Sequence, residues 1–158
     1  PSPNLPNMAS IYLYPSLGLF EGTEVSVGRG TNMPFQQIGS PYFDGHEYFF
    51  VPNPTKGARF PKHENEKCYG FDLSSFGKHE MPEMKQVYLH WLDTMHSGHQ
   101  SDQPFFLSNN FFNLLSGNEV LQKQIREGLS IKDIRATWEE ELNSYMEIRQ
   151  KYLLYPDF

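Results

Sequence analysis

A glycine-rich stretch, residues 20–39, gathers the side chains of this sequence that are best suited to chemistry. It reads FEGTEVSVGRGTNMPFQQIG, and we single out the acid Glu21 and the cation Arg29. Gly28 and Gly30 flank Arg29, so the backbone on both sides can adopt positive φ and admit a close neighbour. A guanidinium held in this way can bind a carboxylate or phosphate through two parallel hydrogen bonds. The alternative is an ordinary turn in which Arg29 pairs with Glu21 or a surface acid.

Two further features of this stretch bear on chemistry. Val25 and Val27 alternate with Ser26, which predicts a short strand whose serine points to the opposite face from the valines. Glu21 is the candidate catalytic acid, because glycoside hydrolysis uses a pair of carboxyl groups and this acid borders the glycine-rich loop. Its alternative role is that of a capping or loop acid that accepts hydrogen bonds from backbone N–H groups.

Histidine and cysteine offer weaker leads. His90, His96 and His99 lie close together in the chain, but their spacing fits no zinc-ligand signature, so we expect solvated histidines at a helix end and no metal site. Cys68 adjoins Lys67, which could activate a thiolate nucleophile. Its place at the start of an apolar segment favours a small buried side chain instead. We expect no cofactor.

The composition excludes several classes of partner. A chain of 158 residues with 38% hydrophobic residues fits one domain with a substantial core. The net charge of −6 and the lack of a basic stripe argue against nucleic acid as a partner. No apolar run approaches the ~20 residues of a membrane span. Aromatic residues reach 15%, which indicates either a core rich in large rings or a stacking surface for sugars or bases.

The order of the predicted elements indicates an α+β fold, with a small mixed sheet of short strands packed with several helices and a long C-terminal helix. Residues 1–7 are expected to be extended and residues 53–67 to form a long polar connection. We predict short strands at residues 25–27, 48–51, 68–73 and 105–107. We predict helices or helical turns at residues 8–14 (interrupted at Pro15 and resumed over 17–20), 34–38, 82–95, 110–116, 118–127 and 130–152. Ile131, Ile134, Trp138, Leu142, Tyr145 and either Ile148 or Arg149 trace the expected buried face of the last helix.

Four phrases carry a resemblance to a known family: PSPN, YP…LFEGT, GRGT-x-x-PF and the closing RQKYLLYP. Together with PTKGARFPKHENEKCYGFDL they cover almost the whole chain. They resemble the C-terminal half of a bacterial family of exo-β-N-acetylmuramidases of peptidoglycan recycling, formerly a domain of unknown function.

The resemblance implies an organisation that the residues alone do not show. Family members are about twice as long, with a Rossmann-like N-terminal half, a substrate cleft between the halves and the principal catalytic acid in the N-terminal half. We therefore expect residues 1–158 to be a single α+β domain, an excised or processed C-terminal half that completes the cleft. The implied partners are a peptidoglycan-derived saccharide and the N-terminal half. The implied location is secreted or periplasmic, although the first residues show no signal peptide.

The resemblance also implies which residues contact the substrate. N-acetylmuramic acid carries a lactyl carboxylate, which Arg29 could bind, and an N-acetyl group within reach of hydroxyl or backbone N–H groups. The candidate substrate-binding residues are Ser2, Asn4, Glu21, Ser26, Gly28, Arg29, Gly30, Thr31, Lys62 and His63. Ser2 and Asn4 are included because they lie at the expected domain junction, and Lys62 and His63 because relatives have a similar basic–histidine pair.

Three functions remain open at this point. The first is the substrate-side domain of an exo-acting glycosidase, inactive in isolation because at least one carboxyl group is missing. The second is a non-catalytic module that binds a glycan or an acidic ligand through Arg29 and the aromatic residues. The third is a dimerisation domain whose exposed aromatic residues form its interface.

Overall fold

The computed structural model describes residues 2–43 and 47–155. The chain forms two compact units, unit 1 (Pro1–Glu119) and unit 2 (Val120–Phe158). The α+β class is confirmed, because the described residues combine one small sheet in unit 1 with several helices. No helix among them is both long enough and apolar enough to cross a bilayer. The assignment of residues 1–158 to one domain stays a prediction.

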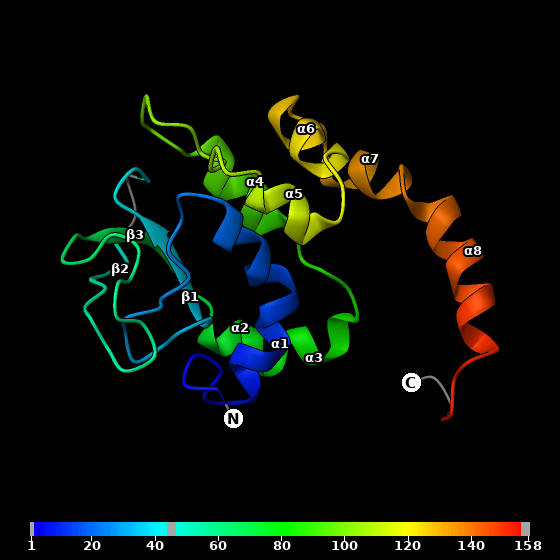
Figure 1. Ribbon diagram of the computed structural model, residues 1–158, viewed down its shortest axis with the longest axis horizontal. Coiled ribbons are helices and arrows are strands. Elements are labelled where there is room, and N and C mark those ends of the chain that lie inside the picture. The colour runs from blue at the N-terminus through cyan, green and yellow to red at the C-terminus, as the bar shows by residue number, and fades with distance from the viewer. Residues whose placement is uncertain (1, 44–46, 156–158) are drawn as a thin grey trace. The chain divides into compact units, whose positions relative to one another are not determined.

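Three short strands of unit 1 form the sheet, in the order β1-β3-β2 (Figure 1). β1 is Gln37–Ser40, β2 is Phe49–Phe50 and β3 is Cys68–Asp72. Both pairings are antiparallel rather than mixed, with Ile38 opposite Phe71 in one and Phe50 opposite Cys68 in the other. The predicted strands at 48–51 and 68–73 are thus confirmed.

The other two predicted strands are reduced to isolated bridges. Ser26 exchanges both backbone hydrogen bonds with Gly39, and Thr23 pairs with Phe106. Val25, Ser26 and Val27 are all buried. The segment is therefore enclosed on all sides, which explains why its two faces do not differ.

The helices of unit 1 surround a core of large apolar side chains. Leu13, Leu17, Phe20 and Phe112 are almost completely buried there. The helical elements are α1 (Met8–Leu17), the 3-10 helix η1 (Gly18–Gly22), α2 (Ser74–His79), α3 (Met81–Met84), α4 (His90–Ser97) and α5 (Phe111–Ser116).

Three of our helix predictions in unit 1 are wrong. α1 continues through Pro15 instead of stopping there, because burial of Leu13 and Leu17 on one face outweighs the lost backbone hydrogen bond. Residues 34–38 form no helical turn, since Phe35 has φ 53° and strand β1 begins at Gln37. The third wrong prediction is a single helix over residues 82–95.

Residues 82–95 form two helices, α3 and α4, rather than one. Lys85 adopts the left-handed conformation, with φ 47°, and ends α3. The backbone N–H of Tyr88 then donates to Ser16 Oγ at 2.8 Å instead of to a helix carbonyl. Packing of the Tyr88 ring against Trp91 and Phe76, with centroids 4.6 and 5.3 Å apart, fixes this non-helical connection.

Unit 2 consists of α6 (Val120–Arg126), α7 (Ile131–Ala136) and α8 (Glu139–Gln150). The predicted cap is confirmed, because Ser130 Oγ accepts from the Asp133 N–H at 3.1 Å. A single helix over 130–152 is wrong, because backbone hydrogen bonding tightens to the i−3 pattern at Thr137 and Trp138. Thr137 Oγ1 also accepts from Gln124 Nε2 at 2.9 Å, which holds this break.

The expected buried face of the last helix is confirmed only in its first part. Ile131 and Ile134 are buried, but none of the residues of α8 is. The apolar side chains of α8 that we expected to be buried, Leu142, Tyr145 and Ile148, are each more than half exposed. A period of 3.6 marks which face of a helix is apolar, but it does not supply the surface that would cover that face.

Candidate functional site

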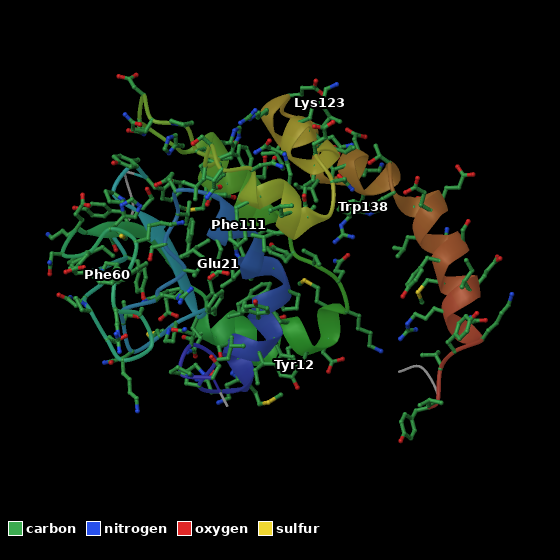
Figure 2. All side chains as sticks on the ribbon, in the orientation of Figure 1. Tyr12, Glu21, Phe60, Phe111, Lys123 and Trp138 are labelled. Atoms are coloured by element: carbon green, nitrogen blue, oxygen red, sulfur yellow. The ribbon has the colours of Figure 1, made fainter. Side chains whose placement is uncertain are left out.

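A pocket of about 530 Å³ lies between the glycine-rich loop and the 53–63 connection of unit 1. This volume is within the range of small-molecule sites, roughly 300–1,000 Å³. The residues that line it are Glu21, Val25, Ser26, Val27, Arg29, Lys56, Gly57, Ala58, Arg59, Phe60, Pro61, Lys62 and Phe111. Figure 2 labels three of them, Glu21, Phe60 and Phe111, on three separate segments of the chain.

Gly28 and Gly30 shape the backbone around Arg29: the close neighbours of Gly28 are Met33 and Gln37, whereas Gly30 brings the two loops into contact. The φ angles of the two glycines are 74° and 85°, as the flanking of Arg29 led us to expect. A Cβ at Gly30 would lie 2.6 Å from both the carbonyl oxygen of Asn53 and Cβ of Pro61. The close neighbour of this glycine is thus the 53–63 connection, and Asn53 N also donates to Gly30 O at 2.8 Å.

Arg29 and Glu21 form an ion pair at the edge of the pocket. Arg29 Nη1 donates to Glu21 Oε1 at 2.9 Å, and both side chains keep part of their surface accessible. This single contact uses one of the five guanidinium N–H donors. Arg29 can therefore hold Glu21 and still offer donors to a second carboxylate.

Lys62 and His63 hold the backbone behind the pocket. Lys62 Nζ donates to the carbonyl oxygens of Thr23 and Val25. His63 Nε2 lies 2.6 Å from the carbonyl oxygen of the residue between them, Glu24. Three consecutive carbonyl groups are thus bound by two consecutive side chains, which fastens the 53–63 connection to residues 23–25.

The surroundings of Lys62, a cation of the pocket lining, change its pKa. Burial lowers its pKa to about 8, and the carboxylates of Glu24 and Glu21 oppose part of that shift. Two of its three N–H donors are taken by carbonyl groups, which leaves one for the pocket that the side chain lines. Lys62 therefore presents a positive charge at neutral pH that is lost above about pH 8.

The pocket is basic although the chain is acidic. Four cations line it, Arg29, Lys56, Arg59 and Lys62, against a single acid, Glu21. Within the described ranges, no ion pair engages Lys56 or Arg59. In a chain of net charge −6, this concentration of positive charge favours an anionic ligand.

The remaining predicted residues support the loops. Thr31 Oγ1 donates to Gly28 O at 2.7 Å and accepts from Gln37 Nε2 at 2.6 Å, so this hydroxyl is engaged by the protein itself. Ser26 lines the pocket but is nearly buried. Asn4 Nδ2 donates to Gly57 O at 3.0 Å, next to the lining. The hydrogen bonds of Ser2 among the described residues go only to its near neighbours in the chain, Asn4 and Leu5.

Sequence reasoning missed four lining residues and one buried acid. Lys56 and Arg59 lie in the long polar connection predicted over residues 53–67, but nothing in the sequence places them in one pocket with Arg29. Phe60 is 90% exposed, an unusual state for a phenylalanine, and only the structure shows it at the pocket together with Phe111. The fifth is Glu24, which is 7% exposed and lies among histidines.

The alternative chemistries receive no support from the geometry. Burial raises the pKa of the Cys68 thiol to about 12, and the side chain is fully buried, so its thiolate is inaccessible at neutral pH. Within residues 2–43 and 47–155, no cluster of three or more histidine, cysteine or acidic residues is arranged to hold a metal ion. His99 is buried in the fold rather than solvated at a helix end.

The chain thus combines an α+β fold with a basic, partly aromatic pocket in unit 1. The family model described as "Exo-beta-N-acetylmuramidase NamZ, C-terminal" matches residues 12–155, and the chain belongs to this family. It is 34% identical to the peptidoglycan β-N-acetylmuramidase NamZ of Bacillus subtilis (strain 168), over 98% of this chain and 40% of that protein.

A solved structure gives the same result. The crystal structure of a DUF1343 family protein from Bacteroides fragilis matches with a TM-score of 0.91 and 42% identity. The match covers 100% of this chain and 44% of that one. The chain therefore spans less than half the length of either relative. The resemblance to the muramidase family is confirmed by the family model and by the Bacillus subtilis relative.

Proposed function

We propose that this chain is the part of a peptidoglycan β-N-acetylmuramidase that completes the substrate cleft and binds the carboxylate of N-acetylmuramic acid. The observation that carries the proposal is the pocket, where Arg29 and three further cations surround a space large enough for a sugar. The Bacillus subtilis relative is a peptidoglycan β-N-acetylmuramidase, which supports the substrate class.

The aromatic side chains of the pocket fit a sugar ligand. Phe60 and Phe111 line the same space as the four cations. Aromatic faces offer apolar area with a defined orientation, which suits the C–H faces of a pyranose ring. A carboxylate on Arg29 and a ring against Phe60 or Phe111 would fix a ligand at two points, and hence its orientation.

The carboxyl groups of the pocket bear on catalysis. Glu21 is the only acid among its described lining residues, and it is paired with Arg29. Glycosidases as a rule use two carboxyl groups, one on each side of the scissile bond. The described lining of this pocket supplies only one of them. We propose that the principal catalytic acid lies outside this chain, in a Rossmann-like N-terminal half, and that a role for Glu21 is secondary.

The biological setting is part of the same proposal. Release of N-acetylmuramic acid from non-reducing ends would serve cell-wall recycling, and the enzyme would act as a secreted or periplasmic protein. The alternative is a module that captures a glycan or another acidic ligand without turnover, which the same cations would support. Hydrolysis by the longer protein, lost when Arg29 is replaced, would favour the enzyme over the module.

Replacing Arg29 with lysine should weaken binding of N-acetylmuramic acid about tenfold, or about 1.4 kcal/mol. Lysine keeps the charge but lacks the planar fork that binds a carboxylate through two hydrogen bonds. Arg29→Gln should weaken binding further, because Glu21 is then an unpaired anion beside the ligand. Binding would be measured by isothermal titration calorimetry at low salt.

The control for Arg29→Gln is Lys123→Gln, which changes the net charge equally at an exposed position in unit 2, outside the pocket lining. This variant should bind like the parent chain. Equal losses in Arg29→Gln and Lys123→Gln would mean that overall charge, and not the pocket, attracts the sugar. That result would contradict the proposed function.

A further inference from the structure

Glu24 is the most deeply placed acid of the site region, and the proposed function leaves it without a role. Its side chain is 9% exposed, and each of its carboxylate oxygens has a separate set of neighbours. Oε2 accepts from Ser40 Oγ at 2.7 Å and lies 3.4 Å from His63 Nε2. Oε1 lies 3.3 Å from His99 Nδ1.

The ring of His99 has one nitrogen whose protonation is fixed by its neighbour. Nε2 lies 2.7 Å from the carbonyl oxygen of Gln103. A carbonyl oxygen can only accept a hydrogen bond, so Nε2 must carry a proton. If the ring were neutral, Nδ1 would then be unprotonated and its lone pair would face the Glu24 carboxylate.

That neutral arrangement is unfavourable because both atoms would be acceptors. The His99 side chain is only 9% exposed, so little water is available to separate them. Nδ1 has no aligned hydrogen bond with any described group, Glu24 included, so its 3.3 Å contact with Glu24 Oε1 is a contact of charge. Tyr42 and Phe105 present ring contacts to His99, with centroids 5.8 and 5.7 Å away, and these rings supply no donor aimed at Nδ1.

We propose that Glu24 and His99 hold one proton between them at neutral pH, and that Glu24 is thereby a positioning residue for the pocket. The proton resides on His99 Nδ1, as an imidazolium–carboxylate ion pair, or on Glu24 Oε1, as a neutral pair in close contact. Either placement turns two opposed acceptors into a donor and an acceptor. The pair fastens His99 to residues 23–25.

The position of this pair links it to the pocket. The carbonyl groups of Thr23 and Val25, on either side of Glu24, bind Lys62, and the carbonyl of Glu24 binds His63. The backbone N–H of Glu24 donates to Phe105 O at 2.9 Å, from the segment that follows His99. The shared proton thus lies between residues 23–25, which bind Lys62 and His63, and the 99–105 segment.

Among the described residues, the charged or titratable groups around the pair are Lys62, His63, Glu66 and the buried Cys68 thiol, whose pKa the Glu24 carboxylate helps to raise. Lys62 is attracted to Glu24 through space, and His63 lies against its second oxygen. Glu66 lies 3.9 Å from the far nitrogen of His63 and is 58% exposed. Since Ser40 and His63 already engage Oε2, the shared proton belongs to the Oε1 side.

Nuclear magnetic resonance of the histidine rings at pH 7 tests the proposal directly. We expect His99, assigned by loss of its signals in His99→Gln, to show protons on both ring nitrogens, or else a neutral ring with a protonated carboxyl signal from Glu24. A neutral Nε2-protonated ring beside an ionised Glu24 would overturn the proposal. This readout in the unmodified chain requires no ligand and is independent of the proposed function.

Glu24→Gln provides the second test. Its amide can donate to His99 Nδ1 and accept from Ser40, so we expect a folded chain in which His99 is a neutral ring at pH 7. Glu66→Gln, the same change at the exposed acid near His63, should leave the His99 signals unchanged. A doubly protonated His99 ring that persists in Glu24→Gln would overturn the assignment of the proton to this pair.

The positioning role of Glu24 rests on the proposed function, and sugar binding by Glu24 variants tests it separately. Glu24→Ala should weaken binding of N-acetylmuramic acid severalfold, and Glu24→Gln should restore most of it. Binding equal to the parent in Glu24→Ala would remove the positioning role but leave the ring result standing. Failure of the parent chain to bind the sugar at all would instead count against the proposed function.

Discussion

Replacing Gly30 with alanine is expected to destabilise unit 1 by about 3 kcal/mol. The backbone at Gly30 has φ 85°, which costs an L-residue with a side chain about 1–2 kcal/mol. The added Cβ would also lie 2.6 Å from the carbonyl oxygen of Asn53 and from Cβ of Pro61. Relief of that overlap must separate the two pocket loops, at a further cost of about 1–3 kcal/mol. Urea denaturation of the two proteins measures the difference.

Gly117→Ala is the matched control. Gly117 has nearly the same φ, 82°, and a Cβ added there meets no atom within 4 Å. It should therefore lose only the conformational part, about 1–2 kcal/mol. If the two variants lose the same stability, the contact between the pocket loops contributes nothing measurable. Such a result would remove the structural reason for a glycine at position 30.

Raising the pH from 7 to 9.5 should weaken binding of N-acetylmuramic acid about threefold to tenfold. The pKa of Lys62 is lowered by burial to about 8, so its charge is present below this pH and lost as the pH rises through it. The sugar carboxylate stays ionised across this range, so its attraction to Lys62 falls in the same window. Calorimetric titrations at several pH values measure the profile.

Lys62→Arg is the control for this profile, since a guanidinium stays charged throughout the range. Its affinity should change little between pH 7 and 9.5. N-acetylglucosamine, which lacks the carboxylate, should bind the parent chain with no comparable pH dependence. An equally steep profile in Lys62→Arg would show that another group carries the effect.

The sequence predicts the fold class well because its signals are local. The Ser130 cap, the glycines after α5 and α6 and the β-forming residues of β3 each act within a few residues. The errors arise where distant contacts decide the backbone. Examples are the Ser16 hydroxyl that binds the Tyr88 N–H and the Gln124 amide that holds Thr137.

The same contrast between local signals and distant contacts decides which site residues could be predicted. Arg29, with glycines on both sides, was recognisable as a cation on a special backbone, and the structure places it in a pocket. Lys56, Arg59 and Phe60 reach that pocket only because Gly30 admits the 53–63 connection. Glu24 carries no sequence signal, since its histidine neighbours lie 39 and 75 positions further along the chain. Those separations exceed what any periodicity or spacing rule can relate.

The most direct test of the account compares two sugars on the folded chain. Amide shifts would be followed by nuclear magnetic resonance during titration with N-acetylmuramic acid and, separately, with N-acetylglucosamine, which differs in lacking the lactyl ether. We expect amide shifts at residues 28–31 and 56–62 with N-acetylmuramic acid and much weaker shifts with N-acetylglucosamine. Equal responses to both sugars, or none to either, would contradict recognition of the carboxylate by this pocket.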